Sequence, residues 1–272
     1  MDQQDKARPR LLRIDGDDNR PAAGKKRPRG GKATFKTIQF QPVFVNTKNV
    51  RHFEVMMDCL AQGEGEGRMG MVYSRAGRGK TRTAQWYAAH NGCVYLRIEN
   101  VWRSSELGFL QALCLELNII KPPGKKGDCF RLAVDRLIDD PRPVFLDELE
   151  KLPKSFLETI RDLSDISTAP FIIIGEEEIV PYMQNNRRVW SRCYYKLEFE
   201  PIDTSDIIRY CFESTGLRLT SPVAAILGAS SEGDFRLARR DLLALIQIAN
   251  ANQSTEITEE MAEIAVKTGL RN

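Results

Sequence analysis

The chain has 272 residues, 42% of them apolar, which is enough to bury a sizeable core as one large domain or a domain with a small appendage. No apolar run approaches the roughly 20 residues that cross a bilayer, and the N-terminal residues lack the apolar stretch of a signal peptide, so we expect a cytoplasmic protein without a membrane partner. The six cysteines form no C-x-x-C pair and only two histidines accompany them, which argues against a disulfide scaffold or a zinc site.

The net charge of +3 is unevenly distributed along the chain. Residues 1–36 contain eleven basic and five acidic residues, a net +6 that leaves −3 for the remainder. Apolar side chains are few in this stretch, so we expect a basic, disordered arm. Such an arm can neutralise nucleic-acid phosphates without reading sequence, or it can act as a solubilising tail.

From residue 37 onward, short apolar runs alternate with amphipathic stretches, the pattern of a parallel sheet covered by helices. The predicted strands are Met69–Ser74, Val94–Glu99, Val144–Asp147, Phe171–Gly175 and Lys196–Phe199. Residues 37–201 are therefore predicted to form a three-layer α/β domain. Ligand chemistry should gather at the C-terminal ends of its strands.

After Pro201 the sequence contains helical patterns only. The predicted helices are Thr204–Thr215, Ser221–Ala229, Asp234–Asn250 and Thr258–Lys267. Serine, threonine or aspartate stands at the N-cap position of the first, second and fourth, and Gly216, Gly233 and Gly269 mark the ends of helices. Residues 202–272 are thus predicted to form a small, all-helical lid.

A glycine-rich segment follows the first predicted strand and precedes a predicted helix over Arg82–His90. Such a turn directs several backbone N–H groups toward one point at the positive end of the helix dipole, which favours phosphate. We assign nucleotide binding to Ala76, Gly77, Arg78, Gly79, Lys80 and Thr81. Lys80 should reach the β and γ phosphates of ATP, and the Thr81 hydroxyl should ligate Mg²⁺. Ser74 stands where the P-loop pattern has its first glycine, a position that would be strained if it required a positive φ.

A second motif lies at the end of the strand Val144–Asp147, where Asp147 and Glu148 follow an apolar run. We expect this strand beside the strand that leads into the glycine-rich turn. There, Asp147 can hold Mg²⁺ directly or through water, and Glu148 can orient and polarise the attacking water.

The strand, P-loop, Asp-Glu strand and trailing helices, in this order, resemble the AAA+ family. More narrowly they resemble the transposition-regulator group, the small ATPases that partner DDE transposases (phage Mu B protein, TnsC, IstB and TniB). The resemblance covers roughly residues 40–272 and is strongest at the P-loop and at Asp147-Glu148. It implies a P-loop AAA+ fold with a C-terminal helical lid, and ATP and Mg²⁺ as ligands.

The resemblance also implies a role for Glu176, which follows the strand Phe171–Gly175. At this position, called sensor 1, the family usually has an asparagine or threonine that helps to place the water. An acid there would repel the γ-phosphate unless Mg²⁺, Lys80 or an arginine compensates. We therefore expect ATP binding but slow hydrolysis.

Two further arginine roles follow from the same resemblance. Arg192 lies in the segment where the family keeps its arginine finger, which reaches the ATP of the neighbouring subunit, and it is the first choice, with Arg187 and Arg188 as alternates. The alternative is that these are surface or DNA-facing charges. Arg236 matches the sensor 2 arginine, which touches the γ-phosphate and reports nucleotide state to the lid.

Two basic loops can face DNA. One contains Arg103, and the other, Lys121–Gly127, contains Lys125 and Lys126. In the transposition ATPases the corresponding loops track the DNA backbone, so these three residues are the candidate contacts to phosphate. The second loop can equally be a plain surface turn.

Taken together, the sequence predicts an ATPase, converting ATP and water to ADP and phosphate, that binds duplex DNA without sequence specificity. It should assemble as a homo-oligomer with ATP at its subunit interfaces, as a ring or a filament, and select a target for or activate a DDE transposase. A helicase loader or replication initiator would share the nucleotide residues. A nucleotide-regulated interaction module that hydrolyses poorly is the other alternative.

Overall fold

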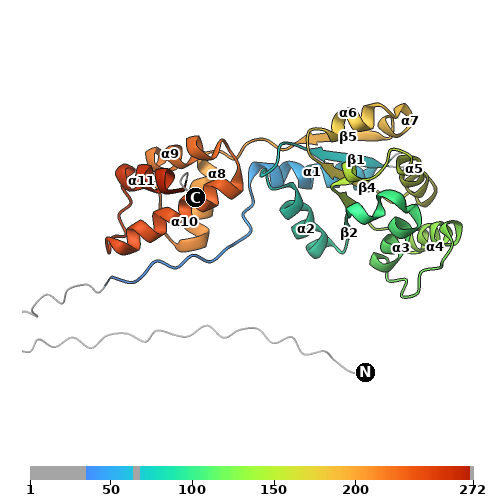
Figure 1. Ribbon diagram of the computed structural model, residues 1–272, viewed down its shortest axis with the longest axis horizontal. Coiled ribbons are helices and arrows are strands. Elements are labelled where there is room, and N and C mark those ends of the chain that lie inside the picture. The colour runs from blue at the N-terminus through green and yellow to red at the C-terminus, as the bar shows by residue number, and fades with distance from the viewer. Residues whose placement is uncertain (1–34, 64–67, 270–272) are drawn as a thin grey trace, which may run out of the picture. The chain divides into compact units, whose positions relative to one another are not determined.

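The computed structural model describes residues 35–63 and 68–269 (Figure 1). Residues from Thr37 onward group as one unit, and the predicted disorder of the arm, residues 1–36, falls almost wholly outside the described ranges. The elements of the larger unit are α1 (Lys48–Gln62), β1 (Met69–Tyr73), α2 (Lys80–Asn91), β2 (Val94–Arg97), η1 (Asn100–Ser104), α3 (Glu106–Glu116), α4 (Lys126–Asp139), β3 (Val144–Asp147), η2 (Leu149–Lys151), α5 (Phe156–Ser167), β4 (Phe171–Gly175), α6 (Ile179–Gln184), α7 (Arg187–Trp190), β5 (Cys193–Glu198), α8 (Thr204–Thr215), α9 (Ser221–Ser231), α10 (Phe235–Ala251) and α11 (Glu259–Gly269).

The five strands form one parallel sheet in the order β2-β3-β4-β1-β5. The predicted bounds of β3 and β4 are confirmed, and β1 and β2 end one and two residues earlier than predicted. The prediction for β5 was wrong by three residues at its start, because Tyr194 and Tyr195 are 65% and 39% exposed on this edge strand. An edge strand with exposed side chains lacks the continuous apolar run of a central strand.

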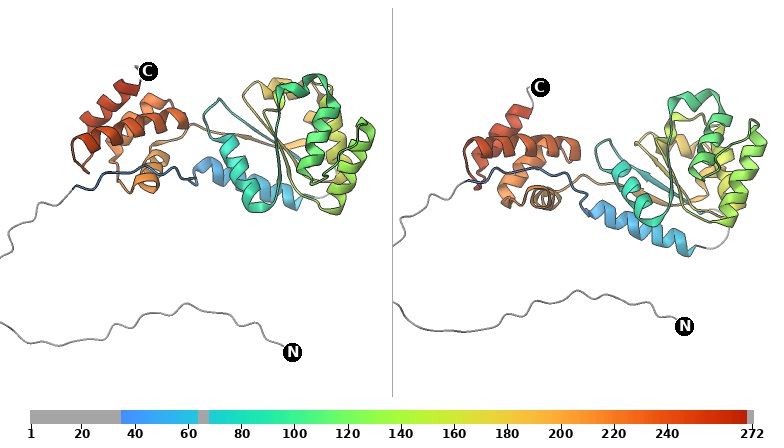
Figure 2. Two further views of the ribbon diagram at one scale, coloured as in Figure 1. Left: turned by 60° about the horizontal axis from the view of Figure 1, so that its bottom comes forward. Right: turned by 90° about the horizontal axis from the view of Figure 1, so that it is seen from below.

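Each face of the sheet packs against helices, so the predicted three-layer arrangement is confirmed (Figure 2). On one face, Val72, Phe145 and Ile172 pack with residues of α1 and α2. On the other, Met71, Leu146 and Ile173 pack with residues of α3 to α7. Because successive residues of one strand point to opposite faces, burial of both faces explains why the central strands read as continuous apolar runs.

Helix α1 precedes the sheet and has no counterpart among the predicted elements. Its buried face contains Val50, Phe53, Met56, Met57 and Leu60, the spacing of an amphipathic helix. Gly70 of β1 allows this helix to approach closely, since a Cβ there would lie 2.9 Å from the Cδ1 atom of Leu60.

An extended segment over residues 37–47 leads into α1; we call it the strap. The Ile38 N–H donates to Asn250 Oδ1 (2.8 Å), and the Asn250 amide donates to the Ile38 carbonyl (2.9 Å). The Gln41 N–H donates to the Ser214 carbonyl (2.8 Å). The strap is therefore hydrogen-bonded to helices α8 and α10.

Helices α8 to α11 make up the all-helical C-terminal part, here called the lid. The predicted bounds agree within two residues. Helix α8 begins with a capping box in which Asp203 accepts from the Asp206 N–H and Asp206 accepts from the Asp203 N–H. In the described part of the chain no helix is long and apolar enough to cross a bilayer.

The lid depends on a fully buried carboxylate. Asp241 of α10 accepts hydrogen bonds from the Ser230 hydroxyl of α9 (2.8 Å) and from Arg240 Nε (2.9 Å). We expect Asp241→Ala to lower the free energy of unfolding by about 2 kcal/mol, because it leaves both donors without their acceptor. Urea denaturation measures this change. Glu263→Ala, which removes an exposed i,i+4 pair with Lys267, should cost no more than about 0.5 kcal/mol; equal losses for the two variants would contradict the role given to Asp241.

Candidate nucleotide-binding site

The phosphate loop connects β1 to α2, which begins at Lys80, two residues before the predicted start. Gly77 and Gly79 have φ angles of 80° and 94°, a conformation that favours glycine. Ser74 is 2% exposed and has no positive φ, so serine fits the first position of the motif without backbone strain. The loop therefore has the glycine-dependent turn and helix N-terminus that bind phosphate.

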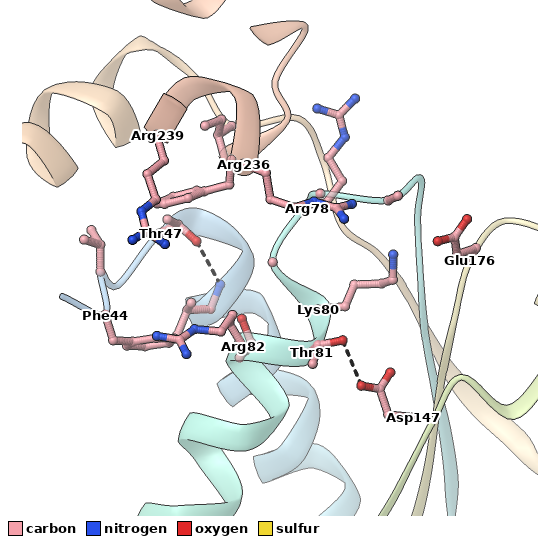
Figure 3. A pocket seen from close by; sticks show the side chains of 18 of the residues that line it. Phe44, Thr47, Arg78, Lys80, Thr81, Arg82, Asp147, Glu176, Arg236 and Arg239 are labelled. Carbon is pink, nitrogen blue, oxygen red and sulfur yellow. Dashed lines mark hydrogen bonds between the residues drawn. The ribbon is translucent and has the colours of Figure 1, made fainter. Parts of the chain in front are cut away.

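The Lys80 side chain lies along this loop and is only 9% exposed (Figure 3). Its Nζ donates to the Ser74 carbonyl (2.8 Å), the Ser74 hydroxyl (3.0 Å) and the Arg75 carbonyl (3.0 Å). Burial lowers the pKa of Lys80, and the carboxylates of Glu176 and Asp147 act in the opposite direction. The oxygens of the loop itself thus hold the ammonium group in place.

Asp147 contacts the first turn of α2. Its Oδ2 atom accepts hydrogen bonds from the Thr81 hydroxyl (2.8 Å) and the Tyr95 hydroxyl (2.7 Å), and the residue is 2% exposed. The expectation that its strand neighbours β1 was wrong, because β4 lies between β1 and β3. The side chain nevertheless reaches Thr81, so the two oxygen ligands expected for Mg²⁺ are together, as a hard cation requires.

Tyr95 was not predicted as part of the site. Burial, followed by its hydrogen bond to Asp147, raises the pKa of Tyr95, so it stays a hydroxyl donor to that carboxylate. The sequence offers only a weak sign of this contact, namely that Tyr95 lies on β2 two residues before the strand ends at Arg97.

Glu148 follows β3 with a φ of 62° and is held by two cations. Its Oε1 atom accepts from Arg97 Nη2 (2.6 Å), and its Oε2 atom pairs with Lys151. Partial burial raises the pKa of Glu148, but the hydrogen bonds from Arg97 and Lys151 outweigh it and hold the pKa below its ordinary value. The carboxylate is therefore ionised at neutral pH, as a group that polarises water by accepting its proton must be.

Two further acids meet at the end of β4. Glu176, the sensor 1 candidate, is exposed and lines the cavity. Its N–H donates to Glu150 Oε1 (3.4 Å), while the buried Glu150 Oε2 has no hydrogen-bond partner among residues 35–63 and 68–269. Burial raises the pKa of Glu150. Gly175 makes room for this carboxyl, since a Cβ there would lie 2.4 Å from it.

A cavity of about 630 Å³ connects these groups with an apolar end. The apolar end is lined by Val43, Phe44 and Val45 of the strap and by Tyr210 and Phe235 of the lid. Phe44 also stacks on Trp86 of α2, with ring centroids 4.6 Å apart and an interplanar angle of 7°. The cavity thus has the polar groups of the loop at one end and aromatic and aliphatic side chains at the other, beside Arg82 and Arg239, of the kind that can accept a flat ring. The only sequence signal for the apolar end was the short run Pro42–Val45, which no predicted element included.

The arginine candidates lie in different places. Arg236 is in the first turn of α10, lines the cavity, and has a side chain that is 70% exposed. Arg192 does not line the cavity; its Nε atom lies 3.1 Å from each carboxylate oxygen of Asp165 on α5. Arg187 and Arg188 are exposed on α7.

The two basic loops lie next to each other. Lys126 pairs with Glu106 (2.5 Å), the residue with which α3 begins after η1. Arg103 on η1 and Lys125 before α4 are both exposed. Trp102 packs against the ring of Phe109, with centroids 6.5 Å apart, so it is partly buried in the body.

A parallel sheet in this strand order, a phosphate loop after β1, paired acids after β3 and a helical lid are the features of the P-loop AAA+ fold. Consistent with this class, residues 63–183 match the AAA domain family. The chain is similar to Cdc6p from Pyrobaculum aerophilum (TM-score 0.63, 16% identity, 86% of this chain and 71% of the other). It is also similar to the RuvB Holliday junction branch migration motor of Thermotoga maritima (TM-score 0.53, 15% identity, 82% and 70%). These likenesses concern the fold.

A more particular similarity is to the Mu-like prophage FluMu DNA transposition protein B of Haemophilus influenzae. The two are 27% identical over 164 residues, 56% of this chain and 54% of that protein. The similarity therefore spans about half the length of that relative. Together with the AAA domain match, it confirms the resemblance to AAA+ ATPases of the transposition-regulator group.

We expect Arg97→Gln to raise the pKa of Glu148 toward its ordinary value near 4.5, because one of the two cations that hold it is lost. The stabilisation by this pair should be present above that value and disappear as the pH falls through the lowered pKa. A carboxyl NMR titration and urea denaturation between pH 3 and pH 7 measure both effects. An unchanged Glu148 titration in the variant would contradict the ion pair.

Proposed function

We propose that this protein is a cytoplasmic ATPase that binds duplex DNA without sequence specificity, assembles on it as a homo-oligomer, and selects a target for or activates a DDE transposase. The observation that carries the nucleotide part is the contact between Thr81 and Asp147 beside the buried Lys80, since it unites phosphate loop, metal ligands and cation in one cavity. The DNA and transposase parts rest on similarity to a transposition protein.

In the proposed site, the N–H groups of Ala76 to Thr81 and the Lys80 ammonium bind the phosphates, and the base lies in the apolar end. Thr81 and Asp147 would hold Mg²⁺, which would supply positive charge to the phosphates. The carboxylate at Glu148 orients and polarises the attacking water. Arg236 contacts the γ-phosphate from the lid.

Hydrolysis in this proposal is completed by a neighbouring subunit. Arg192 reaches the ATP of the next protomer after leaving Asp165, with Arg187 and Arg188 as alternates on α7. Head-to-tail contacts of this kind generate rings or filaments rather than closed dimers. ATP between subunits then favours assembly, and its hydrolysis releases the assembly.

A second candidate, a nucleotide-regulated switch with little turnover, is favoured by two observations. Both oxygens of Glu148 are engaged by Arg97 and Lys151, and an acid, Glu176, stands at the sensor 1 position. A phosphate-release assay with and without duplex DNA separates the candidates, since the switch predicts no turnover under either condition. The likeness to Cdc6p, at 16% identity, concerns the fold and does not favour a replication initiator.

We expect Lys80→Ala to abolish ATP binding and ATP-dependent DNA binding together, because the loop loses its only buried ammonium. Calorimetry measures the first effect and fluorescence anisotropy with labelled duplex DNA the second. Lys267→Ala, which removes an exposed lysine of α11, is the control and should change neither. Loss of ATP binding with full DNA affinity in the presence of ATP would show that the two activities are not coupled.

Charge reversal at the basic loops tests the DNA contacts. Arg103→Glu and Lys125→Glu should each weaken binding alike on unrelated duplexes and reduce the salt slope by about one phosphate contact. Lys267→Glu serves as the control for charge reversal elsewhere. The single change at Lys125 is cleaner than one at Lys126, which would also break the pair with Glu106. A loss confined to one DNA sequence would rule out phosphate tracking.

A further inference from the structure

The phosphate loop is bonded to the start of the lid at two points. The Arg78 side chain is only 8% exposed, and its Nη1 atom donates to the Glu232 carbonyl at 2.7 Å. The Phe235 N–H, the first of α10, donates to the Gly77 carbonyl at 2.9 Å. Consecutive residues of the loop therefore hold the turn 232–235, which leads into α10.

The turn is shaped to receive the Arg78 guanidinium. Glu232 and Gly233 both have positive φ angles, 49° and 74°. A Cβ on Gly233 would lie 2.4 Å from Arg78 Nη1 and 2.4 Å from the Cβ of Pro201. The missing side chain at Gly233 thus leaves the space that the guanidinium occupies.

The neighbouring contact is equally close. A Cβ on Gly77 would lie 1.9 Å from Asp234 Oδ2, so only glycine fits there beside the lid. Asp234 is the N-cap of α10, and its Oδ1 atom accepts from the Arg236 N–H at 2.7 Å. The loop, the N-cap and Arg236 therefore form one continuous set of contacts.

The side chain of Arg236 is weakly restrained. Its ion pair in the described chain is with Asp234 at 3.8 Å, and the side chain is 70% exposed. Figure 3 shows Arg78 coming from the phosphate loop and Arg236 from α10, both lining the cavity. The placement of Arg236 over the phosphate end therefore depends on where α10 begins relative to the loop.

We propose that Arg78 is a positioning residue rather than a phosphate ligand, whose guanidinium sets the register between the phosphate loop and α10 and so holds Arg236 over the third phosphate. This inference rests on the proposed nucleotide binding. It gives Arg78 a specific consequence: because Arg236 would reach only the phosphate that ADP lacks, Arg78 controls the preference for ATP over ADP.

The direct alternative is that Arg78 binds phosphate through its own side chain. If Arg78 were a phosphate ligand, it would strengthen ATP and ADP binding together. The fold-loss of ATP affinity on removing Arg78 would then multiply with the fold-loss on removing Arg236. A positioning residue acts through Arg236, so the two losses would not multiply. The two roles therefore differ in a double-mutant cycle.

The experiment measures Kd for ATP and for ADP, with Mg²⁺, in the wild type, R78A, R236A and the double variant. We expect R236A to lower the ATP-to-ADP preference about tenfold, the size of one charge-assisted contact. R78A should lower it by a similar factor, and the double variant by no more than either alone. R75A, which removes an exposed arginine of the same loop, controls for charge and should leave the preference within about twofold.

Amide hydrogen exchange gives a readout that needs no nucleotide. In R78A, exchange of the Phe235 amide should accelerate, because the turn that presents it to Gly77 is no longer held. R78K keeps the charge but not the planar fork and should fall between wild type and R78A in both measurements. It also replaces R78A if that variant does not fold.

The possible results distinguish failure of the proposed function from failure of the role given to Arg78. A wild type that binds no nucleotide overturns the proposed function, while the Phe235 exchange still tests the Arg78 contact. If the wild type binds ATP, two results overturn only the positioning role. One is a loss of ATP affinity in R78A that multiplies with the loss in R236A, and the other is an equal loss of ATP and ADP affinity in R78A. An unchanged Phe235 amide in R78A and R78K overturns it as well.

Discussion

The hydrogen bond from Thr81 to Asp147 spans the middle of the sheet, because β4 separates the strand before Thr81 from the strand that ends in Asp147. Its length of 2.8 Å requires that the start of α2 and the end of β3 be held at the same level along the strand direction of the sheet. The buried strands provide this, since β1, β4 and β3 are paired in register over their whole lengths. The apolar core is therefore what allows two short polar side chains to meet.

Around that contact the charges are arranged in layers. Lys80 lies on the loop carbonyls, Glu148 lies between Arg97 and Lys151, and the half-buried Glu150 accepts a hydrogen bond from the Glu176 N–H. For the buried members, Lys80 and Asp147, electrostatic interactions are stronger than they would be in water. Positive groups lie near the loop, and acids lie at the ends of β3 and β4. The affinity for an anion bound between them should therefore depend strongly on its charge.

Much of the fold and part of the site were predictable from the sequence. Central strands were found because burial on both faces makes them continuous apolar runs, and the lid helices because capping residues mark their ends. The strand order could not be predicted, because nothing in the sequence indicates that β4 lies between β1 and β3. Tyr95, Arg97 and Glu150 were missed for a related reason: their importance comes from neighbours that are distant in sequence, and each is an ordinary residue in its own segment.

The strap gives the molecule a second connection between sheet and lid, beside the chain that passes through residues 199–203. Asn250 ties the strap to the lid at Ile38, and Asn49, at the other end, donates to the Glu200 carbonyl (2.8 Å) and accepts from the Glu200 N–H (3.0 Å). Two bodies joined at one flexible point can swivel freely, whereas here the strap is one of two chain tethers and the bonds from Gly77 and Arg78 to the turn 232–235 restrict the lid further, to small rocking movements. Since Phe44 lies on one tether, any such rocking displaces an aromatic wall of the cavity along with the helices.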